Sequence, residues 1–306
     1  MRFNILTIHK EPNYGACLQA YALYHALEKL GCEARMINLS LDYRGRAYSI
    51  KNRVLMPLYR VLKGYDYCFG KAEAFSKKHT ACRTVNFNTA KELTAFHWEC
   101  DDAFIIGSDQ VWNPSITQRL SKVFCLDFLP DGCDKRYSYA SSLGSIKDER
   151  ERLSQLDMDA IRKLRMVGVR EQFGAEFLKR KGVDSTVVVD PTLLIDDYTY
   201  LLEHEPQPKD EVLLLTLSDN SALEAFCEQV ASESGMPIRK LYGYLQPERK
   251  KNRKFVSIEG WLQSIAEAEM VVTDSFHACV FAIMFRKQFV FFTEEAAKRP
   301  RLENLF

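Results

Sequence analysis

A buried strand that runs almost directly into a helix is the sequence feature that most restricts how this chain can fold. The apolar run Met270–Val272 has the length of a strand, and the apolar residues that follow His277 continue for the length of a helix. Only the short polar segment that begins at Thr273 separates the two runs. This order is typical of an open α/β sheet with parallel strands, in which ligands bind at the carboxyl ends of the strands.

His277 is the candidate catalytic residue at this junction. The first turn of a helix offers backbone N–H groups and a partial positive charge, and both favour anions. An imidazole in the same place can exchange protons near neutral pH. We therefore predict that His277 acts on a bound anion.

The alternation of strands and helices extends over most of the chain. We expect two domains, because 306 residues are many for a single core. The boundary is placed at the end of a charged helix near residue 164, and a helical excursion is expected over about residues 41–95. The predicted strands of the first half include Met1–Ile8, Ala34–Asn38, Asp101–Gly107, Val123–Phe128 and Arg136–Ala140, and those of the second half include Met166–Val169, Val187–Val189, Glu211–Leu217, Ile238–Tyr242 and Gln288–Thr293.

Charge and cysteine content exclude several classes of protein. Lysine and arginine number 42 and aspartate and glutamate 41, so the basic face that nucleic acid requires is not expected. We expect no signal peptide and no transmembrane segment, because no apolar run approaches the length of a membrane span. The nine cysteines include no CxxC pair, which argues against structural zinc. We expect them to be reduced core residues of a cytoplasmic protein.

The loop after the first strand is a second candidate site. Asn13, Tyr14 and Gly15 precede a helix with apolar residues at helical spacing, so they lie at the ligand edge of the predicted sheet. The loop contains neither GxGxxG nor GxxxxGK[ST], which excludes the usual nucleotide-binding fingerprints. The alternative to ligand contact is a tight turn that needs asparagine and glycine.

A dense polar turn follows the predicted strand that ends at Gly107. Ser108, Asp109 and Gln110 lie next to Trp112 in the sequence. A carboxylate, an amide and an aromatic face together suit a sugar, which presents hydroxyl edges and apolar ring faces. The alternative is a turn whose aspartate and asparagine bind their own backbone.

Arg170 follows the predicted strand Met166–Val169. Its guanidinium could hold a carboxylate or a phosphate with a fork of donors. A salt bridge with Glu171 or another acid is the alternative, and the sequence does not choose between the two.

The ordered set of these segments resembles the polysaccharide pyruvyl transferase family. The segments that carry the resemblance are Asn13–Leu23, Gly107–Pro114, Tyr139–Gly144, Val169–Glu171, Asp190–Leu194 and Thr273–His277. The resemblance implies an α/β protein with two Rossmann-like domains that face a cleft, similar to GT-B glycosyltransferases. Residues 1–164 would form the acceptor side and residues 165–306 the donor side.

The family resemblance also implies an activity. Characterised members transfer pyruvate from phosphoenolpyruvate to two hydroxyls of a sugar in a cell-surface or capsular polysaccharide precursor, which forms a ketal and releases phosphate. In this chain His277 and Asp109 would be catalytic, with Arg170, Ser275, His277 and Arg301 on the donor. Asn13, Tyr14, Gly15, Ser108, Gln110 and Trp112 would contact the acceptor. We expect no metal and no cofactor beyond phosphoenolpyruvate as co-substrate, and a cytoplasmic enzyme that reaches lipid-linked sugars at the inner membrane face.

One position departs from the family pattern. Characterised members often carry Arg-Leu-His where this chain has Ser275-Phe276-His277, so a positive charge is lost beside the expected anion. Arg299 or Arg301 could replace it. The sequence ends within an apparent amphipathic helix, and we expect the natural protein to continue further. Two alternatives stay open, a GT-B glycosyltransferase that uses a nucleotide sugar and a non-catalytic glycan-binding relative.

Overall fold

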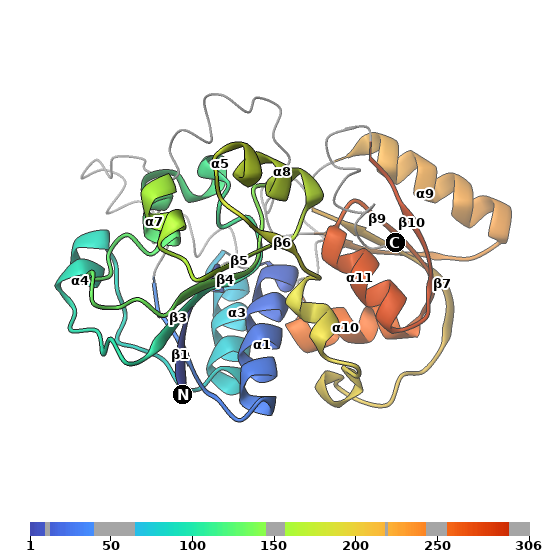
Figure 1. The fold of residues 1–306 in the computed structure, drawn as a ribbon. Coiled ribbons are helices and arrows are strands. Elements are labelled where there is room, and N and C mark those ends of the chain that lie inside the picture. The colour runs from blue at the N-terminus through green and yellow to red at the C-terminus, as the bar shows by residue number, and fades with distance from the viewer. Residues whose placement is uncertain (10–12, 40–64, 145–156, 218–219, 243–255, 294–306) are drawn as a thin grey trace, which may run out of the picture.

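The computed structural model describes residues 1–9, 13–39, 65–144, 157–217, 220–242 and 256–293 of the chain. Two β-sheets with helices packed around them form this part of the protein (Figure 1). Every pairing between the strands of these sheets is parallel. The predicted α/β class with parallel sheets is therefore confirmed.

The first sheet has six strands in the order β2-β1-β3-β4-β5-β6. They are β1 (Arg2–Leu6), β2 (Glu33–Met36), β3 (Ala103–Ile106), β4 (Arg136–Ser141), β5 (Met166–Val169) and β6 (Thr186–Val187). The central strand β3 is buried at all of its residues, as expected where helices cover both faces of a parallel sheet. The carboxyl ends of β3, β4, β5 and β6 therefore share one edge of the sheet.

The second sheet has four strands in the order β10-β9-β7-β8. They are β7 (Lys209–Thr216), β8 (Ile238–Tyr242), β9 (Ala268–Thr273) and β10 (Gln288–Phe291). The register pairs Leu215 of β7 with Thr273 of β9, and Thr273 in turn with Phe291 of β10. The predicted strand before His277 is thus an inner strand of this sheet.

Two sequence predictions about strands are wrong. β5 and β6 were expected to begin the second half, but β5 pairs with β4 and β6 pairs with β5, so both belong to the first sheet. The sheets thus divide the chain after residue 187 and not at residue 164. Residues 123–125, expected to begin a strand, form the 3-10 helix η2 (Val123–Cys125). Leu126 follows it with a φ of 60°, which a strand cannot accommodate.

The helices connect and cover the strands. Those of the first half are α1 (Tyr14–Lys29), α3 (Tyr65–His79), α4 (Ala90–Ala95), α5 (Pro114–Thr117), α7 (Met158–Arg162) and α8 (Gln172–Arg180). Those of the second half are α9 (Ser221–Ser234), α10 (Ile258–Glu267) and α11 (Phe276–Met284), with the short 3-10 helices η4 (Pro191–Leu194) and η5 (Thr199–Leu201). The first half also contains the short 3-10 helix η1 (Gln118–Leu120). Helices α3 and α4 lie within the predicted excursion, and residues 41–64 of it lie outside the described residues.

Helix α1 is packed between the two halves. Ala20, Leu23 and Leu27 pack in one core cluster with Ile5 of β1, whereas Leu18 and neighbouring residues pack in another with residues of α10, α11 and β9. Figure 1 shows α1 and α3 next to α10 in the middle of the molecule. Because α1 contacts both halves, its first turn can meet a residue of α11, which belongs to the second half.

Cys100 and Cys133 form a disulfide bond, so the prediction that all cysteines are reduced is wrong for this pair. The bond links the segment before β3 to the segment before β4, across 33 residues of sequence. Cys133 is fully buried in the first core cluster, and Cys100 packs against that cluster. A pairing between segments this far apart leaves no trace in local sequence spacing.

Reduction of this disulfide is expected to lower the free energy of unfolding by about 2–4 kcal/mol, because the bond restricts a long loop of the unfolded chain. Cys133→Ser should show the same loss, measured by urea denaturation with and without reductant. Cys82→Ser provides the control, because Cys82 is a free, partly buried cysteine. Equal stability of Cys133→Ser and wild type would contradict the prediction.

Among the described residues, no helix combines the length and the apolar character that crossing a membrane requires.

Candidate active site

The junction at residues 273–277 forms as the sequence predicts. β9 ends at Thr273, whose hydroxyl donates to the Leu215 carbonyl at 2.7 Å and accepts from the Ser275 N–H at 3.0 Å. Ser275 is the N-cap of α11, and its hydroxyl accepts from the Ala278 N–H at 3.4 Å. His277 therefore lies in the first turn of α11, in a position fixed by the end of a strand and by a capped helix.

The His277 ring lies between Asp190 and the first turn of α1. His277 is 8% exposed. Its Nε2 atom has no hydrogen-bond partner among the described residues and lies 3.6 Å from Asp190 Oδ2. On the side of α1, a Cβ atom added to Gly15 would fall 2.1 Å from His277 Nδ1. Only glycine at position 15 leaves room for the imidazole, which explains a glycine within a helix.

Asp190 connects His277 to Arg170. Its Oδ2 atom accepts from Arg170 Nη1 at 2.9 Å and from the Ser108 hydroxyl at 2.8 Å. Its Oδ1 atom accepts from the hydroxyl and the N–H of Thr192, at 2.7 and 3.1 Å. The side chain of Asp190 is fully buried. The carboxylate is therefore held in one orientation by residues that follow two strands of the first sheet and by the start of η4.

The charges around this carboxylate determine its ionisation. Burial by itself raises the pKa of Asp190, but the adjacent imidazole of His277 and guanidinium of Arg170 lower it more. The pKa of Asp190 therefore lies well below its ordinary range. For Arg170, burial by itself lowers the pKa, but the charges of Glu171, Asp190 and Asp109 together raise it above its usual value. Asp190 and Arg170 thus form a permanently charged pair.

Glu171 lies on the other side of the Arg170 guanidinium and is fully buried. Its Oε1 atom accepts from Arg170 Nε at 3.3 Å and from the Ser142 hydroxyl. The Ser142 hydroxyl accepts in turn from the Gly144 N–H at 3.1 Å. Glu171 Oε2 is buried without a hydrogen-bond partner among the described residues. Two buried carboxylates thus share one guanidinium, which also lies 4.7 Å from the centre of the Phe276 ring.

The polar turn after β3 reaches the same edge of the sheet. Asp109 has a φ of 69°, and its carbonyl accepts from the Ser142 N–H at 3.0 Å. Its Oδ1 atom accepts from the Gln110 N–H at 2.8 Å. Both side chains are partly exposed, so they can meet a ligand. The charge of Asp109 acts on Arg170, which places the turn next to the buried cluster.

The structure brings together most of the residues that the sequence selected. His277, Arg170, Ser108 and Gly15 meet around Asp190, and Ser275 lies two residues before the imidazole. Asp109 and Gln110 lie beside this group. The salt bridge proposed as the alternative role of Arg170 is present with both Glu171 and Asp190. Contact of Arg170 with an anionic donor stays a prediction, and Arg301 lies outside the described residues.

Three predicted acceptor contacts have other roles. Trp112 is fully buried in the core, and its indole N–H donates to the Phe124 carbonyl at 2.9 Å, so its expected role at a sugar is wrong. The Tyr14 ring stacks on Trp261 at 5.4 Å, and its hydroxyl donates to the Val256 carbonyl. Asn13 caps α1 by accepting from the Ala16 N–H. These side chains stabilise the fold around the site.

Asp190 and Glu171 are central residues of the cluster that were absent from the predicted site. Each follows an apolar strand segment directly or by one residue, in Val187-Val188-Val189-Asp190 and Gly168-Val169-Arg170-Glu171. An acid at the end of an apolar run was the available signal. No feature of the sequence indicates that Asp190 contacts His277, which lies almost 90 residues later.

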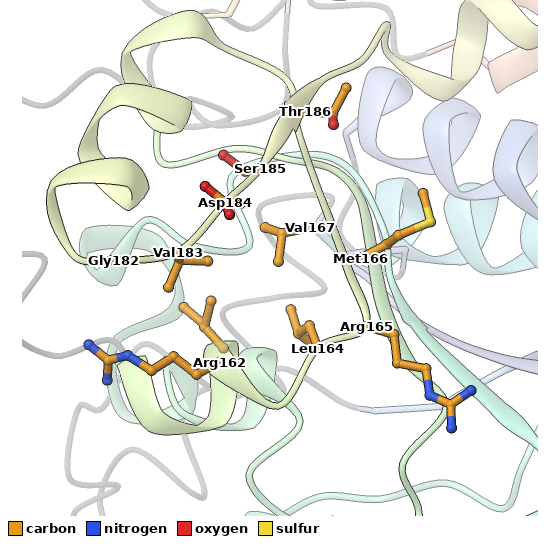
Figure 2. A pocket seen from close by; sticks show the side chains of 11 residues that line it. Arg162, Leu164, Arg165, Met166, Val167, Gly182, Val183, Asp184, Ser185 and Thr186 are labelled. Atoms are coloured by element: carbon orange, nitrogen blue, oxygen red, sulfur yellow. The ribbon is translucent and has the colours of Figure 1, made fainter.

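A pocket of about 420 Å³ lies at the opposite edge of the first sheet. It is lined by Leu164 and Arg165, the start of β5 and the segment Gly182–Thr186, whereas Arg170 and Asp190 follow the carboxyl ends of β5 and β6. Figure 2 shows the guanidinium groups of Arg162 and Arg165 directed outward from this pocket. It is therefore separate from the cluster around His277. In the described part of the chain, no group of three or more His, Cys, Asp or Glu side chains is arranged to hold a metal ion.

Several solved structures share the fold at low sequence identity. The UDP-GlcNAc 2-epimerase of Methanocaldococcus jannaschii is 13% identical with a TM-score of 0.53, over 99% of this chain and 87% of that one. S. aureus MnaA is 10% identical with a TM-score of 0.55, over 96% and 79%. The UDP-N-acetylglucosamine 2-epimerase from Rickettsia bellii is 12% identical with a TM-score of 0.51, over 96% of this chain and 79% of that one. These likenesses show a GT-B-like fold.

Comparison with the curated proteins gives no match. The family model for polysaccharide pyruvyl transferase matches residues 13–295, which is nearly the whole chain. The match includes the N-cap of α1, the polar turn after β3, Arg170, Asp190 and the His277 junction. The chain therefore belongs to the polysaccharide pyruvyl transferase family.

Proposed function

We propose that this protein transfers pyruvate from phosphoenolpyruvate to a sugar of a cell-surface or capsular polysaccharide precursor, which forms a pyruvate ketal and releases phosphate. The observation that carries the proposal is the position of His277. It lies in the first turn of α11, beside a fixed carboxylate and a buried guanidinium. The family, to which the chain belongs, supports transfer to a polysaccharide.

The reaction needs one proton donor and two hydroxyl nucleophiles. Protonation of the methylene carbon of phosphoenolpyruvate gives an oxocarbenium-like carbon, which the first sugar hydroxyl attacks. The second hydroxyl then displaces phosphate and closes the ketal. One hydroxyl proton replaces the proton used on the methylene group, and the other leaves with phosphate. His277 is the proposed general acid and base, because imidazole can give and regain a proton near neutral pH.

The donor and the acceptor would meet next to the cluster of His277, Asp190 and Arg170. The first turn of α11 offers N–H groups to the phosphate or carboxylate of the donor, next to Ser275. Arg170 contributes its charge to this region, although it is already paired with Glu171 and Asp190. Asp109 and Gln110 are partly exposed and would orient the sugar hydroxyls or accept a proton from one. Arg301 stays a candidate for an additional cation on the donor.

Phosphate release in the presence of phosphoenolpyruvate and lipid-linked or nucleotide-linked sugars tests the proposal. We expect release that depends on both substrates, together with a product heavier by one pyruvate ketal in mass spectrometry. Binding of phosphoenolpyruvate alone should raise the melting temperature, since a ligand that binds only the folded state stabilises it.

Two other outcomes would support different functions. Consumption of a nucleotide sugar without phosphoenolpyruvate would indicate a glycosyltransferase or a related activity; among the structures with a similar fold, the M. jannaschii enzyme was solved in complex with UDP-GlcNAc and UDP. A melting temperature that neither phosphoenolpyruvate nor a nucleotide sugar changes would favour a non-catalytic glycan-binding protein.

A further inference from the structure

The two ring nitrogens of His277 lie in different surroundings. Nε2 is buried and lies 3.6 Å from Asp190 Oδ2. Nδ1 lies on the side of α1, next to the main chain of Gly15. In a neutral imidazole one nitrogen carries the proton and the other carries the lone pair that takes part in proton transfer. The surroundings therefore decide which nitrogen is available to a substrate.

The carboxylate of Asp190 favours a proton on Nε2. Asp190 is buried and bonded to Arg170, Ser108 and Thr192, so it presents a fixed negative charge to one side of the ring. This charge attracts an N–H dipole and repels a lone pair at the same position. The 3.6 Å separation is longer than a formed hydrogen bond, and such contacts in catalytic sites often shorten when substrate binds.

The first turn of α1 packs against the His277 ring on the Nδ1 side. A Cβ atom at position 15 would fall 2.1 Å from Nδ1 and 2.3 Å from Cγ, so any side chain there would displace the ring. Glycine is unfavourable within a helix compared with alanine. Its presence in the first turn of α1 is explained by the imidazole that packs against it.

We propose that Nδ1 is the nitrogen of His277 that exchanges a proton with the substrate, that Asp190 keeps the other proton on Nε2, and that Gly15 leaves room for the ring in this orientation. Asp190 and Gly15 are thus positioning residues, which act through His277. The assignment rests on the proposed role of His277 in proton transfer. The protonated nitrogen, however, can be identified in the free protein, without any substrate.

Nitrogen-15 NMR of protein labelled in its histidine rings tests this assignment. The chain has 6 histidines, and the His277 signals are those that disappear in His277→Gln. In neutral His277 we expect Nε2 to carry the proton and Nδ1 to show the shift of an unprotonated nitrogen. Asp190→Asn should move the two shifts toward each other, because the fixed charge is gone. A proton on Nδ1 in the wild type would overturn the assignment.

Gly15→Ala tests the role of α1. We expect the added methyl group to shift both His277 signals and to lower kcat for phosphate release by about 100-fold, with the KM for phosphoenolpyruvate nearly unchanged. Gly70→Ala in α3 is the matched control, because a Cβ atom there meets nothing within 4 Å. Unchanged His277 signals in Gly15→Ala would refute its role. If the wild type released no phosphate, the proposed function would fail, but the NMR result would still decide the tautomer.

Discussion

Replacement of His277 by glutamine is expected to reduce phosphate release from phosphoenolpyruvate by about 100-fold to 10,000-fold, the usual contribution of a positioned general acid or base. Glutamine has a similar length and polarity but cannot exchange a proton near neutral pH. The side chain of His277 is nearly buried, but its Nε2 atom makes no hydrogen bond among the described residues, so little structural support is lost. The fold should therefore persist while turnover falls by this factor.

Phosphate release and thermal unfolding should be measured on the same preparation. His97→Gln is the matched control, because the His97 side chain is 88% exposed and is not among the residues around Asp190. We expect His97→Gln to retain the wild-type rate, and His277→Gln to retain the melting temperature within a few degrees. Turnover by His277→Gln at the wild-type rate would remove this residue from the mechanism and with it the reason for the site assignment.

Replacement of Arg170 by alanine is expected to lower the free energy of unfolding by about 3–5 kcal/mol, the usual cost of removing one partner from a buried ion pair. The Arg170 side chain is 5% exposed, and those of Glu171 and Asp190 are 0% exposed. Without the guanidinium, two carboxylates would stay in the interior without their cation. Arg170→Lys should fall between alanine and wild type, because it keeps the charge but loses the fork of donors.

Urea denaturation of Arg165→Ala gives the matched comparison. Arg165 also pairs with an aspartate, Asp134, but their side chains are 50% and 63% exposed. A surface pair of this kind contributes at most about 1 kcal/mol. Similar losses in Arg170→Ala and Arg165→Ala would show that burial of the cluster does not govern its energy.

The stability difference between wild type and Arg170→Ala should also depend on pH. The folded-state pKa of Asp190 is below its unfolded value, partly through the charge of Arg170. A carboxylate with a lowered folded-state pKa contributes stability above its unfolded pKa of about 3.9, and the contribution is lost as the pH falls through the lower folded value. The difference between the two proteins should thus be full at pH 7 and should shrink below about pH 4.

The sequence was sufficient for the local elements around the site. β9 ends at Thr273 and α11 begins at Phe276, as the order of apolar and polar residues indicates. These features depend on neighbouring residues along the chain, because a cap or a strand end is decided within a few positions. The local order of residues is therefore enough to place His277 in the first turn of a helix.

Trp112 shows where local pattern misleads. It follows a turn rich in polar residues, which suggested an aromatic face for a sugar, but its ring is in the core and its N–H bonds the Phe124 carbonyl. Asp109 adopts a φ of 69° and bends the chain, which returns the following residues to the interior. A backbone reversal of this kind changes which side chains face the ligand without changing the composition of the turn.

The sequence by itself determined the parallel α/β class and the position of His277 between the end of a strand and the start of a helix. Only the tertiary structure decided that Asp190 connects His277 to Arg170, that Gly15 packs against the imidazole, and that Cys100 bonds Cys133. The physical reason is that periodicity records which face of an element is buried, but not which residue covers it. Contacts between distant segments follow from the order of strands in the sheets and from the packing of α1 between them.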